Sequence, residues 1–232
     1  MKTIGLIGGM SWESTRLYYS EINQGVKQTL GGLHSAKICL YSVDFHDIEQ
    51  LQHQGKWAQT AAILAKAAQA VEAGGADLFL ICTPTMHKVA AEVQAAVNIP
   101  MLHIADATAQ HLLADGVTKV GLLGTAFTMQ QDFYKGRLTQ NFGIEVLVPN
   151  VEQQAMVHEV IYQELCLGQI SQHSKQKYLA VIQDLFNQGA QAVILGCTEI
   201  TLLVQQKDTT VPLYDTTAIH AQSAVAAALG KV

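Results

Sequence analysis

The feature of this chain that most limits its fold is an internal repeat. Three segments of the first half recur in the same order in the second: IGLIGG (4–9) resembles VGLLGT (120–125), LFLICTPT (78–85) resembles AVILGCTE (192–199), and IPMLHIAD (99–106) resembles VPLYDTTA (211–218). The offsets between partners, 116, 114 and 112 residues, are nearly constant. Each match alone is weak, but three matches in order predict two similar structural units.

Short apolar runs alternate with segments of helical period along the chain. The runs predict strands at 3–7, 36–42, 78–81, 101–104, 120–123, 145–148, 192–195 and 211–214. The clearest helices are expected at 56–73, 151–167 and 174–188. Several strands are apolar at every position, which is typical of parallel strands covered on both faces. The alternation predicts an α/β protein with two similar, doubly wound parallel-sheet domains.

The end of the first repeat places the domain boundary near Pro100. The last strand and helix are expected to return to the first unit, so the predicted domains are 1–100 plus 210–232 and 101–209. We expect the two domains to be related by a pseudo-twofold axis. Ligands of open parallel sheets bind beyond the carboxyl ends of the strands. The predicted active site is therefore the cleft between the domains.

Composition excludes several classes of function. Apolar residues make up 49% of the chain and charged residues 14%, against a usual charged share of about 25%, which predicts a large core. The 14 Lys and Arg residues form no run and the net charge is −5, so no nucleic-acid partner is expected. No apolar stretch approaches the roughly 18 residues of a membrane span. The N-terminus lacks the features of a signal peptide, and we expect a cytoplasmic protein with no membrane partner.

The four cysteines, Cys39, Cys82, Cys166 and Cys197, have no metal-binding spacing, and no metal site is predicted. Cys197 stands out because it follows a predicted strand in the segment GCTE, 196–199. The start of a helix there would lower the pKa of the thiol and make it reactive. The alternative is a buried, inert cysteine.

Thr83 occupies the equivalent place in the first repeat. Aligning the Thr-rich ends of the repeats puts Thr83 opposite Cys197. Since strand residues alternate in direction, Cys82 should point to the other face. Pro84 suits the first position of a helix, so Thr83 could instead be a helix cap. A catalytic role and a capping role both stay open at this point.

The turns after the strands offer backbone N–H groups and hydroxyls for a small carboxylate ligand. The segment GGMS, 8–11, is not a GxGxxG sequence, so dinucleotide binding is not favoured. His87 and Glu199 could assist proton transfer; alternatively, His87 faces outward and Glu199 only favours the helix dipole. The candidate substrate-binding residues are Gly9, Met10, Ser11, Pro84, Thr85, Thr125, Thr128, Thr198 and Glu199.

Four motifs together carry a family resemblance: IGLIGGMSWEST, CTPTMHK, LLGTAFTM and GCTEI. Over nearly its whole length the sequence resembles the aspartate/glutamate racemase family. The resemblance implies two facing α/β domains, no pyridoxal phosphate or other cofactor, and two cysteines that act on opposite faces of the substrate. GCTE matches the second cysteine motif, which gives that role to Cys197. The first motif, Cys-Asn-Thr, is replaced by Thr83-Pro84-Thr85.

These features lead us to expect racemisation of aspartate or glutamate. Cys197 would remove the α-proton on one face and Thr83 would transfer a proton on the other. A threonine hydroxyl is a poor base, so we expect unequal rates for the enantiomers. The resemblance to the branch with threonine at this position implies that the L-enantiomer is preferred. The resemblance also implies a homodimer. Two alternatives remain: an isomerase or decarboxylase of a small diacid, and a non-catalytic protein that binds small carboxylates.

Overall fold

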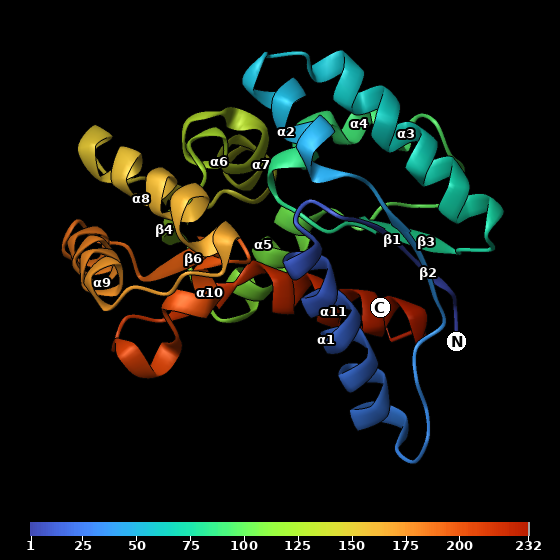
Figure 1. Ribbon diagram of the computed structural model, residues 1–232. Helices are drawn as coiled ribbons and strands as arrows, with labels where there is room; N and C mark the ends of the chain where they lie inside the picture. Colours follow the sequence, from blue (N-terminus) through green and yellow to red (C-terminus); the bar gives the residue numbers. More distant parts are fainter. Residues whose placement is uncertain (232) are drawn as a thin grey trace. The chain divides into compact units, whose positions relative to one another are not determined.

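A computed structural model describes residues 1–231 (Figure 1). The chain forms two compact units. Unit 1 comprises Met1–Ile104 together with the chain from His220 onward, and unit 2 comprises Ala105–Ile219. The chain leaves unit 1 at the start of helix α5 (Ile104–Ala114) and returns within helix α11 (Thr216–Ala228).

Unit 1 contains a parallel sheet in the order β2-β1-β3. Its strands are β1 (Ile4–Gly8), β2 (Ile38–Ser42) and β3 (Leu78–Ile81). Ile4 pairs with both Ile38 and Leu78. A single parallel bridge from Phe79 to Met101 extends the sheet beyond β3.

Side chains of this sheet point alternately to its two faces, and helices cover both faces. Ile7, Phe79 and Ile81 belong to the core on the side of α2 and α3. Leu6 and Leu80 belong to the other core, which includes residues of α1 and α11. The helices of unit 1 before α5 are α1 (Trp12–Leu30), α2 (Phe45–His53), α3 (Trp57–Ala73), the 3-10 helix η1 (Thr85–Val89) and α4 (Ala90–Gln94).

Unit 2 contains a parallel sheet in the order β5-β4-β6-β7. Its strands are β4 (Lys119–Gly124), β5 (Glu145–Leu147), β6 (Ala192–Gly196) and β7 (Leu213–Asp215). The helices between α5 and α11 are α6 (Ala126–Gln130), α7 (Asp132–Phe142), α8 (Val151–Gln163), η2 (Leu165–Leu167), α9 (Gln172–Asn187), α10 (Ile200–Leu203) and η3 (Gln206–Asp208).

The two sheets follow the predicted repeat. Unit 1 has the order β2-β1-β3 followed by Met101, and unit 2 has β5-β4-β6 followed by β7. Ile4 pairs with Leu78 in unit 1, and the repeat-equivalent residue Val120 pairs with Ala192 in unit 2. The predicted α/β class with parallel sheets is therefore confirmed.

The unit boundaries differ from the expected ones at 100/101 and 209/210. Only Met101 of the expected strand 101–104 pairs with the sheet, and Ile104 already begins α5. Strand β7 does not return to unit 1, because it pairs with β6 in the register Val193 to Leu213. Each repeat keeps its own last sheet position, so residues 101–104 lie in unit 1 and 210–219 in unit 2.

Among residues 1–231, no helix combines the length and the apolar character needed to cross a bilayer.

Candidate functional site

Cys197 is the first residue after β6, and the preceding residue, Gly196, has no room for a side chain. A side chain at Gly196 would lie 2.8 Å from the carbonyl oxygen of Leu123. The backbone N–H of Ile200 donates to the carbonyl of Cys197 at 3.1 Å, which begins the short helix α10. Only 7% of Cys197 is exposed.

The thiol of Cys197 donates a hydrogen bond to Oε2 of Glu199 at 2.9 Å. Burial raises the pKa of Cys197 well above its usual value, and the charges of Glu199 and Cys166 act in the same direction. A hydrogen bond from the backbone of Glu199 opposes this rise in pKa but is a smaller effect. The expectation of a lowered pKa is wrong, because α10 has only four residues and begins after Glu199. The raised pKa favours the protonated thiol, which contacts the side chain of Glu199.

Three further predicted residues, Thr125, Thr128 and Thr198, lie near Cys197 in unit 2. Gly124, which ends β4, pairs in register with Gly196. The next residue, Thr125, caps α6 by accepting a hydrogen bond from the backbone of Thr128 at 3.4 Å. The hydroxyl of Thr198 lies 2.8 Å from that of Thr217, in the first turn of α11.

Sequence reasoning missed a buried acidic group in the same unit. Oε1 of Glu164 accepts a hydrogen bond from Ser174 at 2.8 Å. Oε2 is the one buried side-chain oxygen or nitrogen without a hydrogen-bond partner among the described residues. Tyr178 is fully buried, and its pKa is raised first by burial and then by the charges of Cys197 and Glu164. No signal marked Glu164, since it lies inside the expected helix 151–167, where an acidic residue is ordinary.

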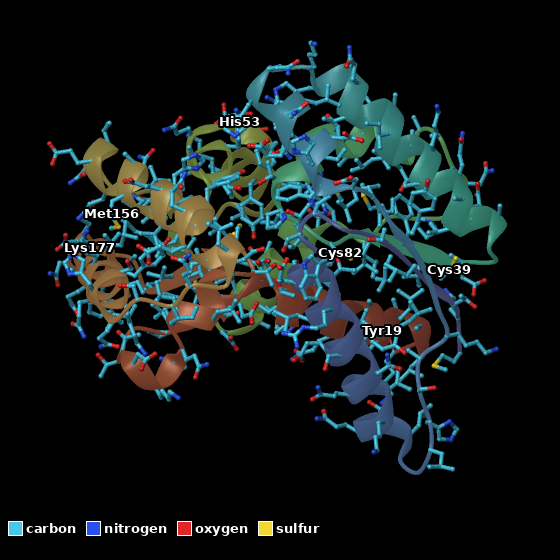
Figure 2. All side chains as sticks on the ribbon, viewed as in Figure 1. Tyr19, Cys39, His53, Cys82, Met156 and Lys177 are labelled. Atoms are coloured by element: carbon cyan, nitrogen blue, oxygen red, sulfur yellow. The ribbon has the colours of Figure 1, made fainter. Side chains whose placement is uncertain are left out.

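Thr83 is the second residue after β3 and matches Cys197 in the alignment of the repeats. Thr83 is half-buried, whereas Cys82 is 1% exposed and belongs to the core on the α1 and α11 side (Figure 2). Burial raises the pKa of the Cys82 thiol. The predicted orientation of Cys82 is confirmed. Thr83 is not the cap of the following helix, because Pro84 is the N-cap residue of η1 and provides no side-chain hydrogen bond.

The ring of His87 contacts the backbone of Thr83. Its Nδ1 is 2.9 Å from the carbonyl oxygen of Thr83. Its Nε2 accepts a hydrogen bond from the backbone N–H of Ile104 at 3.3 Å. The alternative that His87 faces outward is wrong, because only 3% of the residue is exposed.

The Gly-rich turn after β1 is already partly occupied by the protein. The backbone N–H of Gly9, which has φ +92°, donates to Oγ1 of Thr15 at 2.7 Å. Met10 packs in the core with α2 and α3. Ser11 caps α1 by accepting from the backbone of Ser14 at 3.3 Å. The expected free donor at Gly9 is therefore used within unit 1.

The sequence of this chain matches a known protein family. The family model for Asp/Glu/hydantoin racemases matches residues 7–224. The chain belongs to this racemase family. Membership makes it an isomerase-type enzyme of amino-acid racemisation, as the resemblance implied.

Three relatives of this racemase are similar over their whole length. The broad-specificity amino-acid racemase RacX of Bacillus subtilis (strain 168) is 25% identical over 96% of each chain. A crystal structure of a Yersinia pestis protein assigned to the Asp/Glu racemases has 57% identity, a TM-score of 0.93, and coverage of 99% of this chain and 100% of its own. An aspartate racemase homologue from Pyrococcus horikoshii OT3 has 36% identity, a TM-score of 0.86 and the same coverage.

One pocket of the racemase lies in unit 2, and none of the candidate residues lines it. It has a volume of about 410 Å³ and is lined by Leu179, Gln183, Lys207, Asp208, Thr209 and Thr210. No group of three or more His, Cys, Asp or Glu side chains among residues 1–231 is arranged to hold a metal ion.

Proposed function

We propose that this protein racemises aspartate or glutamate without a cofactor, using Cys197 on one face of the substrate and Thr83 on the other. The observation that carries the proposal is the Cys197–Glu199 hydrogen bond of 2.9 Å at the carboxyl end of β6. Thr83 holds the repeat-equivalent position after β3. Membership of the racemase family supports the same reaction type.

In the proposed reaction Glu199 accepts the proton of the Cys197 thiol. The resulting thiolate takes the α-proton of the bound amino acid, and the electron pair of the C–H bond moves into the α-carboxylate. The hydroxyl of Thr83 donates a proton to the opposite face of this carbanion and regains one from solvent. Cys197 keeps the α-proton as its thiol proton, and Glu199 releases its own proton to solvent, which restores the starting state. Donors aimed at the carboxylate stabilise the charge that develops in the transition state.

The substrate carboxylates are proposed to contact the backbone and hydroxyl groups at the strand ends. In unit 1 the donors are proposed to belong to Met10, Ser11 and Thr85. Pro84 has no backbone N–H and the N–H of Gly9 is bonded to Thr15, so these two residues are proposed only to line the site. In unit 2 the groups belong to Thr125, Thr128, Thr198 and Glu199. The same hydroxyls that cap helices could exchange one bond for a contact with the ligand, since a hydroxyl both donates and accepts.

Exchange of the α-proton in D2O tests the function. The protein is incubated with each enantiomer of aspartate and glutamate, and the α-proton is followed by NMR while optical rotation reports racemisation. We expect exchange by the native protein and its loss in Cys197→Ala. Thr83→Ala should keep exchange of the enantiomer that Cys197 deprotonates, and lose racemisation. Cys39→Ala, which replaces a partly buried cysteine in unit 1, is the matched control.

Two results would contradict the proposal. Turnover of maleate or a substituted malonate, with no amino-acid exchange, would identify an isomerase or decarboxylase of small diacids. Binding of dicarboxylates without any turnover would identify a non-catalytic relative.

A homodimer in the cytoplasm is also proposed. Trp12, Tyr19 and Leu30 are 64%, 55% and 44% exposed, and their spacing places them on one face of α1 (Tyr19 is labelled in Figure 2). Exposed apolar faces of this kind mark interaction sites. Light scattering should give twice the chain mass of 25.1 kDa.

Trp12→Lys should shift the protein to the monomer mass. Phe186→Lys, at a residue of unit 2 that is 44% exposed, should not. A native monomer would contradict the dimer.

A further inference from the structure

We propose that His87 is a positioning residue, which holds Thr83 in place for proton transfer and does not carry the proton itself. The inference rests on the proposed role of Thr83. It gives unit 1 a second functional residue.

The hydrogen bonds of His87 determine where its ring proton lies. A carbonyl oxygen can only accept, so Nδ1 must carry a hydrogen to bond the Thr83 carbonyl at 2.9 Å. A backbone N–H can only donate, so Nε2 must be unprotonated to accept from Ile104 at 3.3 Å. The imidazole is therefore neutral, and both nitrogens are bonded to backbone groups. A ring bonded in this way supports the backbone and is not available as a proton relay.

Thr83 needs such support because it lies beyond the last bond of its strand. The backbone N–H of Cys82 donates to Ile7 at 2.9 Å, which is the end of the β1–β3 ladder. In unit 2 the carbonyl of Cys197 is bonded by the backbone N–H of Ile200 at 3.1 Å. The carbonyl of Thr83 is instead bonded by a side chain.

Two other imidazole rings pack against the ring of His87. The ring of His103 lies 4.5 Å from that of His87, and the ring of His220 lies 5.9 Å away. His220 is itself bonded to the hydroxyl of Tyr18 and the carbonyl of Leu102, both at 2.9 Å. Burial lowers the pKa of His220, and the nearby His87 acts in the same direction.

Position matters more for a hydroxyl than for a stronger acid or base. Proton transfer needs heavy atoms within about 2.6–3.2 Å of each other. A displacement of about 1 Å can slow a reaction about 10²-fold. Loss of the His87 hydrogen bond should therefore slow the step at Thr83 and leave the step at Cys197 unchanged.

Two variants separate positioning from a merely structural role. His87→Leu removes both hydrogen bonds, whereas His87→Asn keeps an amide N–H close to the position of Nδ1. For each we measure racemisation by optical rotation and α-proton exchange by NMR in D2O, with the enantiomer that Cys197 deprotonates. His87→Leu should racemise about 10²-fold more slowly with unchanged exchange and KM. His87→Asn should recover most of the racemisation rate.

The outcomes are distinct from those that test the proposed function. Equal losses of racemisation and exchange in His87→Leu, or the same racemisation rate in both variants, would overturn the role of His87. Absence of exchange in the native protein would overturn the proposed function instead. Met86→Leu, a conservative change at a fully buried neighbour in η1, should leave the ratio of exchange to racemisation unchanged.

Discussion

Burial and helix position act in opposite directions on the thiol of Cys197. The end of a helix contributes about 0.3–1 kcal/mol, which is less than one pKa unit at about 1.4 kcal/mol per unit. Full burial shifts the pKa of an ionisable group by up to about 3–5 units. The larger effect raises the pKa of Cys197, so the proposed reaction requires a base beside the thiol, the role proposed for Glu199.

Replacement of Glu199 tests this dependence. Glu199→Gln keeps the shape of the side chain but removes the group that accepts the thiol proton. We expect kcat to fall about 10²–10⁴-fold, the usual contribution of a general base, with little change in KM. Steady-state racemisation of L-aspartate over a range of pH provides the measurement. Glu159→Gln, at an exposed position of α8, is the control, and an unchanged kcat in Glu199→Gln would rule out this role.

The sequence predicts the place of the thiol but not its protonation. GCTE after an apolar run was enough to put Cys197 at the end of β6. Its burial depends on α8, α9 and η2, whose residues pack around it from distant parts of the chain. His87 was misjudged for the same reason, since its partner Ile104 is 17 residues away.

At the level of elements, the C-terminal part of α11 packs in unit 1. Ala221, Ala224 and Val225 pack in the core that also contains residues of α1. His220 joins the two helices through its hydrogen bond to Tyr18 of α1. Burial lowers the pKa of His220 from 6.5 to about 3, and the nearby His87 acts in the same direction.

This lowered pKa predicts how stability depends on pH. Between pH 6.5 and about 3, His220 is neutral in the folded protein and protonated in the unfolded chain. The unfolded state then binds more protons, so stability falls as the pH decreases, by up to about 1.4 kcal/mol per pH unit. In His220→Gln the loss of unfolding free energy on acidification should be smaller. Urea unfolding at several pH values measures it; His34→Gln, at an exposed site, should keep the native slope, and an equal slope in His220→Gln would contradict the prediction.

At the level of the whole molecule, unit 2 is continuous in sequence and unit 1 is not. Unit 1 is completed by the last part of the chain, which supplies His220 and one side of a core. The repeat was visible in the sequence because strands are marked by local apolar runs. The boundary was not, because the sheet that β7 joins is decided by pairing with β6, a long-range contact.

The difference in continuity predicts the behaviour of fragments. Residues 105–219 should fold alone and give a cooperative thermal transition by circular dichroism. Residues 1–104 should fail to do so, because they lack the α11 side of their core. Joining 1–104 to 220–232 through a flexible glycine-serine linker should restore folding. A cooperative transition for 1–104 alone would show that α11 is dispensable.

The acid that partners Cys197 has no counterpart in the other repeat, where Thr85 aligns with Glu199. A racemase, however, interconverts mirror images whose free energies in water are identical. The Haldane relation then forces kcat/KM to be the same for both enantiomers, however unlike the two catalytic groups are. A difference between the two catalytic groups must therefore change kcat and KM by the same factor. The enantiomer with the higher kcat is also the one with the higher KM.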